Sequence, residues 1–166
     1  CLIAEEKEKN TLRNLMLSPA SLADILIGKS LFVFIVTIVV VSLAIFLVGY
    51  EPANLLILAI ALLLSTVFYI ALGTLCGLFA KTIMEASIIV MPVMFIFSFG
   101  PFALSLASAY PILELAKCLP SSQLVLLAEA LEGPYTMMDC IIPIVTITVW
   151  SLLTWGITGF IYKKLN

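Results

Sequence analysis

Histidine is absent from this sequence of 166 residues, and its four cysteines show none of the Cys-x-x-Cys spacings typical of metal sites. The Gly-x-Ser-x-Gly turn of hydrolases, the His-Glu-x-x-His pair of zinc proteases and the Gly-x-x-x-x-Gly-Lys-Ser/Thr phosphate loop are missing too. Metal binding is therefore poorly supported, and ATP binding through a phosphate loop is excluded. No catalytic residue and no cofactor is expected in the chain.

Charged residues are scarce. Eight basic and ten acidic side chains make up 11% of the chain, whereas soluble domains carry about 25%. Hydrophobic residues make up 63%, and the mean hydropathy is +1.25. The sequence therefore predicts an integral membrane protein, and its small charge clusters give no support for nucleic-acid binding. Because it starts with Cys and shows no signal peptide, we expect a fragment or a processed chain that lacks upstream sequence.

Four charge-free runs can each form most of a bilayer-crossing helix, which needs about 20 apolar residues. With their flanks they predict spans at 22–48, 53–80, 84–100 and 140–162. The third span should end at the Gly100-Pro101 break. The expected fold class is all-α, a polytopic membrane helix bundle with four transmembrane helices that form a single domain over 1–166. A short surface helix at 4–19 should precede the bundle.

The basic residues set the expected orientation. If the N-terminal helix is cytosolic, seven of the eight basic residues fall on the cytosolic side, and Lys117 alone falls outside. This asymmetry follows the positive-inside rule. We therefore expect a multi-pass protein of the cell membrane with both ends of this segment in the cytosol.

The segment 101–138 is too apolar for a free loop, and proline interrupts it too often for one helix. Two short helices at 104–109 and 112–119 are expected to dip back into the outer leaflet as a re-entrant hairpin. Ser121 is expected to cap a further, amphipathic helix. Together they predict a cover on the outer face of the bundle.

Two patterns inside the spans have both a functional and a structural interpretation. Gly73 and Gly77 form a Gly-x-x-x-Gly pair, which favours helix packing within the subunit, with a dimer face as the alternative. Phe95, Phe99 and Phe102 share one helix face. They could form an aromatic wall of a substrate path, while packing against lipid or protein is the plainer interpretation.

The four cysteines fit best as small buried hydrophobic residues. A disulfide between Cys118 and Cys140 is the alternative, if the two face one another outside the membrane.

No ionisable residue lies at mid-depth of any expected span, although proton- and ion-coupled carriers usually place such groups there. This absence argues against a proton-driven carrier. The few polar groups in the spans mildly favour an amphipathic or lipid-like cargo, although hydroxyls serve helix packing equally well. These polar groups are Ser42, Ser65, Thr66, Tyr69, Thr74, Ser98, Ser151 and Thr154.

The segment before the first span is strongly charged. Its charges alternate in sign at helical spacing, as in Glu5 and Lys9. Leu12, Leu15 and Met16 add one narrow apolar stripe. The segment therefore predicts a short two-faced helix at the membrane surface that contacts a cytosolic partner.

The charged motif resembles the signature of the type-2 ATP-binding-cassette (ABC) exporter permeases. Residues 6–12 read Glu-Lys-Glu-Lys-Asn-Thr-Leu, and Ser18-Pro19 and a hydrophobic-Gly-Lys stretch at 25–29 follow before a span. The proline-bearing span, the broken hairpin and the basic end of the last span are similar too, so the resemblance covers essentially the whole chain. Asn10 replaces the usual glycine, and the family normally has six spans, which implies that two are missing here.

The resemblance implies a role. In the family, the charged helix rests in a groove of a separate ATPase subunit, and closure of two ATPases on ATP re-orients the spans. It implies a permease subunit of an ATP-driven exporter of a drug, peptide or lipid-like substrate. The subunit would form a homodimer or heterodimer with a second permease, and ATP and Mg would bind the partner ATPase. The coupling residues carried over are Glu6, Lys7, Glu8, Lys9, Thr11, Leu12 and Leu15. The alternative is a non-transporting membrane scaffold or accessory subunit that docks a cytosolic partner.

Overall fold

A computed structural model describes residues 22–107 and 109–165, and every regular element in these ranges is a helix. Four helices are long and apolar enough to cross a membrane, which confirms the predicted helical bundle. They are α3 (Leu22–Val48), α4 (Leu55–Phe79), α5 (Ile83–Ser105) and α7 (Met137–Leu165). The surface helix expected at 4–19 lies outside the described residues.

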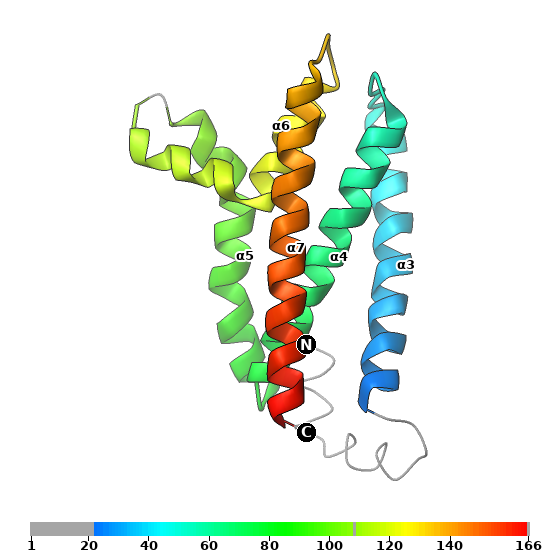
Figure 1. The fold of residues 1–166 in the computed structure, drawn as a ribbon, viewed down its shortest axis with the longest axis vertical. Coiled ribbons are helices and arrows are strands. Elements are labelled where there is room, and N and C mark those ends of the chain that lie inside the picture. Colours follow the sequence, from blue (N-terminus) through cyan, green and yellow to red (C-terminus); the bar gives the residue numbers. More distant parts are fainter. Residues whose placement is uncertain (1–21, 108, 166) are drawn as a thin grey trace.

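The four long helices alternate in direction, and two shorter elements join α5 to α7 (Figure 1). These are η1 (Pro111–Cys118), a 3₁₀ helix, and α6 (Pro120–Ala130). The axes of η1 and α6 differ by 89°. As a result η1 runs across the bundle, whereas the four long helices run along it (Figure 1).

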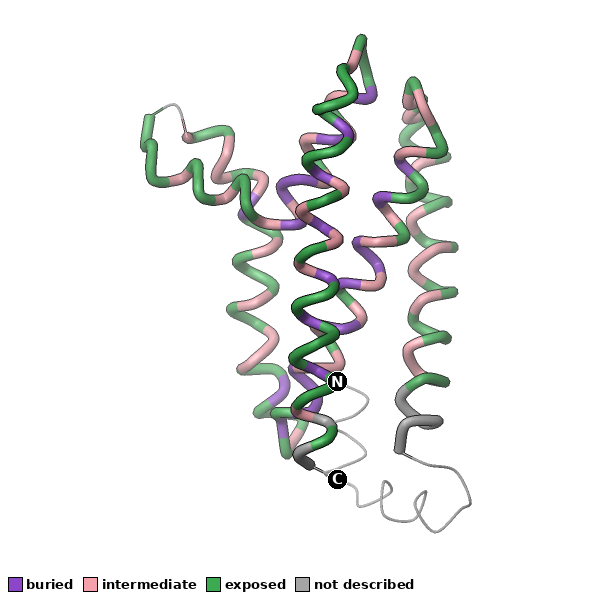
Figure 2. Tube along the Cα trace, in the orientation of Figure 1, coloured by how far each residue is buried: buried purple, intermediate pink, exposed green. Residues whose placement is uncertain are grey.

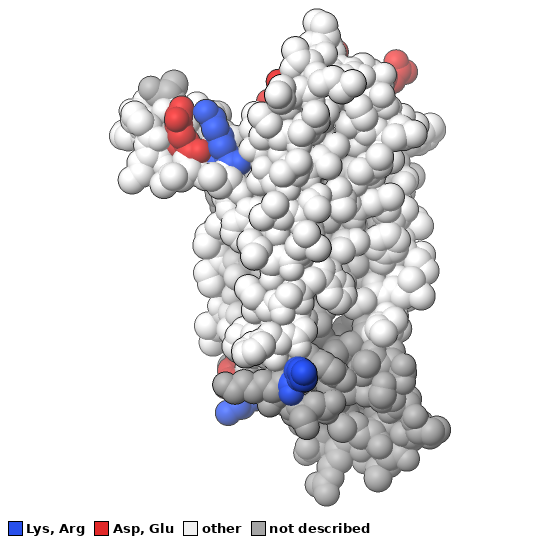
Figure 3. All heavy atoms as spheres, in the orientation of Figure 1, with Lys and Arg blue, Asp and Glu red and all other residues white. Residues whose placement is uncertain are grey.

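The two ends of the bundle differ in charge (Figure 3). One end, called the basic end here, carries the described side chains of Lys29 inside α3, Lys81 in the turn before α5 and Lys163 near the end of α7, together with the carboxylate of Glu85. The opposite, acidic end carries four carboxylates, on Glu51, Glu129, Glu132 and Asp139. The uncharged band between them is the part that suits the hydrocarbon of a bilayer.

The core lies between α4, α6 and α7, where the buried residues of Figure 2 gather. Phe68 is fully buried there, and its ring meets those of Phe97 and Trp150 edge to face at centroid distances of 5.5 and 6.2 Å. The Trp150 indole N–H donates to the Cys118 carbonyl over 2.7 Å. One aromatic cluster therefore joins α4, α5 and α7 and holds the end of η1 against them.

Helix α3 lies at the edge of the bundle, against α4. None of its most apolar window is buried, whereas a third of the corresponding window of α4 is buried (33%). A helix that is apolar on all sides needs lipid or other helices around it. The exposure of α3 therefore identifies the side of the bundle with the least protein packing.

The third span does not break where the sequence suggested. A break was expected at Gly100-Pro101, but α5 continues through Pro101 to Ser105. Proline removes only one backbone donor, and the helix ends within its next two turns, so little hydrogen bonding is lost. Gly100 is buried because residues of the returning chain, Leu119 and Ser122, pack directly on it.

The start of α6 also differs from the expectation. Ser121 was expected to cap this helix, but α6 begins at Pro120, and Leu119 is its N-cap residue without a side-chain bond. Proline at the first helical position has a suitable φ and no N–H to satisfy. The helix expected at 112–119 is present as η1, whereas 104–105 belong to α5 and are followed by a turn.

The turn between α3 and α4 is tied to α6. Gly49 adopts the positive φ of 68° that such a turn requires, and the next residue, Tyr50, donates its hydroxyl to the Ala128 carbonyl over 2.6 Å. The Ala53 N–H donates to the Leu131 carbonyl over 2.8 Å. Burial and the nearby Glu132 carboxylate raise the pKa of Tyr50. The phenol therefore stays protonated and can act as the hydrogen-bond donor to Ala128.

Replacing Tyr50 with phenylalanine removes this hydrogen bond without changing the ring. We expect the free energy of unfolding to fall by about 1 kcal/mol, the usual contribution of one such bond. Denaturant unfolding in detergent micelles measures it. Tyr110→Phe is the matched control, because Tyr110 is 63% exposed. Equal stability of the two variants would contradict the role given to Tyr50.

Candidate functional site

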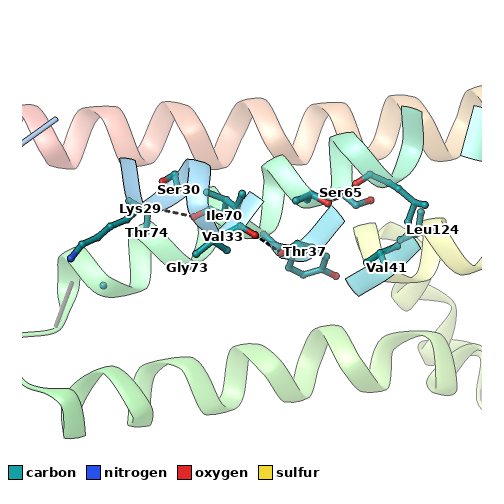
Figure 4. A pocket seen from close by; sticks show the side chains of 14 residues that line it. Lys29, Ser30, Val33, Thr37, Val41, Ser65, Ile70, Gly73, Thr74 and Leu124 are labelled. Carbon is teal, nitrogen blue, oxygen red and sulfur yellow. Dashed lines mark hydrogen bonds between the residues drawn. The ribbon is translucent and has the colours of Figure 1, made fainter. Parts of the chain in front are cut away.

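A groove of about 400 Å³ runs between α3 and α4 (Figure 4). Lys29 lies at one end of it, and Val41 of α3 and Leu124 of α6 lie at the other (Figure 4). The groove therefore extends along the two helices from the basic end toward the aromatic core. Its volume lies within the roughly 300–1,000 Å³ that is usual for sites that bind small molecules.

Hydroxyl groups from both helices line the groove. Thr37 of α3 and Thr66 and Thr74 of α4 each donate to the carbonyl four residues earlier in their own helix, over 2.8 Å. Their oxygens can still accept a hydrogen bond from a ligand. Each methyl group adds to the apolar wall, so the groove is apolar with a small number of acceptors.

Ser65 is the exception among these hydroxyls. It lines the groove and is only 4% exposed, and its oxygen has no hydrogen-bond partner among the described residues. A buried hydroxyl without a partner costs about 1–3 kcal/mol. The oxygen itself is buried, so a hydroxyl or carbonyl group of a ligand would supply the missing bond only after a neighbouring side chain moved aside.

A second cavity of about 440 Å³ lies nearby, lined by α3, α4 and α7. Ser30, Ile70 and Thr74 border both cavities. Helix α3 therefore rests on α4 at a narrow contact that has open space on both of its sides. Trp155 and Thr158 of α7 complete the second cavity, which is more apolar than the first.

Several residues that the sequence suggested are brought together in the groove. Four of the eight expected polar groups line it, namely Ser65, Thr66, Tyr69 and Thr74. Ser151 donates to the Leu64 carbonyl of α4 and to a carbonyl of its own helix, and Thr154 donates within α7; neither residue lines the groove. Ser42 and Ser98 are exposed. The groove residues of α3, such as Val33 and Thr37, were not suggested by any motif.

The two glycines of the Gly-x-x-x-Gly pair also line the groove. A Cβ atom added to Gly73 would meet nothing within 4 Å, so no described helix packs closely at that position. Gly77 is buried. The role of this pair in helix packing stays a prediction, and Gly73 contributes open space to the groove.

The three phenylalanines of α5 lie elsewhere. Phe95, Phe99 and Phe102 are 56%, 56% and 63% exposed, and none of them lines either cavity. The rings of Phe95 and Phe99 stack at a centroid distance of 5.5 Å. A substrate path along them stays a prediction. All seven coupling residues between Glu6 and Leu15 lie outside the described residues.

Cysteines and acidic residues form no metal site in the part of the chain that the structure describes. Cys76 and Cys140 are buried, as expected for small hydrophobic residues, but Cys118 is exposed on η1. All three are free thiols, so the alternative of a disulfide between Cys118 and Cys140 is wrong for this structure. The chemistry that the groove supports is binding, through apolar contact and a few hydrogen bonds.

Comparison with known proteins places the chain in a family. The family model described as ABC-2 family transporter protein matches residues 2–161. The comparison with curated proteins and the comparison with solved structures each gave no match. The family match covers nearly the whole chain, and it agrees with the apolar spans and with the groove between them. The chain therefore belongs to the ABC-2 family of transporter proteins, as a membrane-embedded permease component.

Proposed function

We propose that this chain is the permease subunit of an ATP-driven exporter that moves an amphipathic or lipid-like substrate, such as a drug or peptide, out of the cell. The observation that carries the proposal is the groove between α3 and α4 in a chain of this family. Its apolar walls suit a long apolar part of a substrate. Its hydroxyls, with Ser65 unpaired, suit a small polar part.

The energy would come from a separate ATPase subunit, which would bind ATP and Mg²⁺. The coupling residues between Glu6 and Leu15 would contact that subunit, and α3 follows them directly in the sequence. Because α3 is the least buried span, little core packing opposes its movement. A force on the charged segment would therefore move one wall of the groove, as a rigid-body shift.

Two permease chains, as a homodimer or a heterodimer, would be needed if two ATPases close on ATP. The positive-inside rule places the basic end of the bundle in the cytosol. In this orientation both ends of the chain segment are cytosolic, and η1 and α6 lie toward the outside. Lys29 would then stand at the cytosolic end of the groove, where a substrate would enter.

Reversing the charge of two coupling residues tests the proposal. With Glu6→Lys and Glu8→Lys together, we expect substrate-stimulated ATP hydrolysis by the assembled complex to fall, because the polar rim of the contact would carry the wrong charge. The measurement compares ATPase activity of the complex in proteoliposomes with and without substrate. A non-transporting scaffold would instead show no substrate stimulation in the native complex.

The same reversal at Glu129 and Glu132 is the matched control, since both side chains are exposed at the acidic end. These substitutions should leave stimulation unchanged. If stimulation survives in the Glu6 and Glu8 variant, the coupling role is wrong. If substrate stimulation is lost in both variants, the cause is the change in the net charge of the protein, and the proposed contact at Glu6 and Glu8 is not supported.

A further inference from the structure

The groove between α3 and α4 is electrically asymmetric. Among the described residues that line it, Lys29 alone carries a charge. Figure 4 shows the Lys29 ammonium group at one end of the groove, directed away from Thr37 and Val41. A ligand in the groove therefore meets a positive charge at the basic end and uncharged walls along the rest of its length.

The threonine hydroxyls of the groove are poor partners for an anion. Thr37, Thr66 and Thr74 each donate their proton to a carbonyl of their own helix, so they offer a ligand only acceptor oxygens. Burying a charged group without a compensating partner is very unfavourable. An anionic group of a ligand is therefore favoured at Lys29, and the part of the ligand that enters the groove should be uncharged.

The groove is long and narrow. Lys29 and Val41 line its two ends on α3, and the rise of a helix over these twelve residues is about 18 Å. The volume of about 400 Å³ spread over this length gives a mean cross-section of about 22 Å². A helix with its side chains is about 10–12 Å across, so its cross-section is several times larger. The groove is therefore too narrow for a helical peptide or a further transmembrane helix.

An extended hydrocarbon chain fits these dimensions. An extended polypeptide covers about 3.3–3.6 Å per residue, or about 1.2 Å for each of its three backbone bonds. At the same rise, a chain of about 15 carbons covers the 18 Å from Lys29 to Val41. One leaflet of a bilayer contributes about half of the 30 Å of hydrocarbon. The groove therefore has the length of one phospholipid acyl chain.

We propose that the groove binds one acyl chain of an anionic phospholipid from the leaflet at the basic end, with the phosphate at Lys29 and the chain end between Val41 and Leu124. None of the most apolar window of α3 is buried, so a lipid can reach the groove from the side. This assignment names the substrate class of the groove and rests on the proposed function for transport only. Binding itself requires neither ATP nor an ATPase.

Photochemical labelling tests the lipid contact on the unmodified full chain in phosphatidylcholine vesicles. The probe is a small fraction of phosphatidylglycerol with a diazirine at the tenth carbon of one acyl chain. Thr37 lies eight residues from Lys29, or about 12 Å, which corresponds to about the tenth carbon. After illumination, mass spectrometry of peptides locates the adducts. Val36 is the matched control position, because it lies at the same depth, is 44% exposed and lines neither cavity.

We expect adducts at Thr37 to be several-fold more frequent with the phosphatidylglycerol probe than with the same diazirine on phosphatidylcholine. Adducts at Val36 should be equally frequent with both probes, since bulk lipid reaches that face. Lys29→Gln should remove the preference at Thr37, and Lys29→Arg should keep it. Lys81→Gln should also keep it, because Lys81 is a basic-end lysine that lines neither cavity.

Two outcomes overturn the proposal. Equal labelling of Thr37 by both probes would mean that the groove does not recognise the anionic headgroup. Labelling of Val36 without labelling of Thr37 would mean that protein, such as a second copy of the chain, covers the groove. Either result in a complex that transports an amphipathic substrate with ATP would reject this assignment alone. Preferential labelling of Thr37 in a complex without ATP-dependent transport would reject the proposed function and leave the binding site in place.

Discussion

Leucine at position 73 is expected to lower transport of an amphipathic substrate about tenfold, equivalent to about 1.4 kcal/mol, while the protein stays folded. Gly73 lines the groove, and nothing lies within 4 Å of an added Cβ atom, so the larger side chain enters open space. The groove is near the lower limit of the volume that small-molecule sites need, so a leucine removes room that a substrate requires. Uptake of a short-chain fluorescent phospholipid into inverted vesicles measures the effect.

Gly156→Leu is the matched control for this substitution. Gly156 lies on an exposed part of α7, outside both cavities, and an added Cβ atom there also meets nothing within 4 Å. It should leave both transport and folding unchanged. Transport at the native rate in the Gly73→Leu variant would show that the substrate does not use this groove.

Leucine at position 100 is expected to have its main effect on the fold. A Cβ atom added to Gly100 would lie 2.7 Å from Leu119 Cδ1 and 3.1 Å from Ser122 Oγ. Overpacking of this kind costs about 1–3 kcal/mol. For a chain of this size each kcal/mol lowers the melting temperature by about 2–4 °C. The apparent melting temperature in detergent should therefore fall by several degrees, and α6 and η1 should lose their contact with α5.

A smaller change separates a local clash from a general loss of stability. Gly100→Ala should have a weaker effect than Gly100→Leu, because the end of the Leu119 side chain can move away from a methyl group. Adding Leu119→Ala to Gly100→Leu should restore part of the lost stability, as expected for two residues in contact. If Gly100→Leu melts at the same temperature as Gly156→Leu, the close contact at Gly100 is not present in the protein.

The sequence predicted the class and the number of spans because long apolar runs without charge have few structural solutions. The run from Leu31 to Val48, for example, contains no charged residue and forms one continuous helix with its flank. The positions where helices meet were harder to predict. The Gly73 and Gly77 pattern suggested a close contact, but a Cβ atom added at Gly73 would meet nothing within 4 Å, whereas Leu119 of the returning chain would lie 2.7 Å from a Cβ atom added at Gly100.

The sequence drew attention to polar groups on one wall of the groove, but it did not suggest the groove itself, and the path proposed along Phe95, Phe99 and Phe102 stays a prediction. The α4 hydroxyls Thr66 and Thr74 stood out as rare polar groups in an apolar run, and both line the groove. Its other wall, with Val33 and Thr37, depends on which face of α3 meets α4. Helix α3 is apolar on all sides, so no periodic pattern distinguishes that face. The predicted end of the third span at Gly100-Pro101 was wrong for a separate reason. A proline disfavours a helix interior, but it does not fix the residue at which the helix ends, and α5 continues to Ser105.

The central claim is that a separate ATPase drives an amphipathic substrate through this permease. The most direct measurement purifies the native complex, places it in inverted vesicles and follows a short-chain fluorescent phospholipid by its protection from a membrane-impermeant quencher. We predict protection that grows with time when ATP and Mg²⁺ are present, and that is lost with a non-hydrolysable analogue and reduced in the Gly73→Leu variant. Protection that is the same with and without ATP, in a complex with full ATPase activity, would contradict the account.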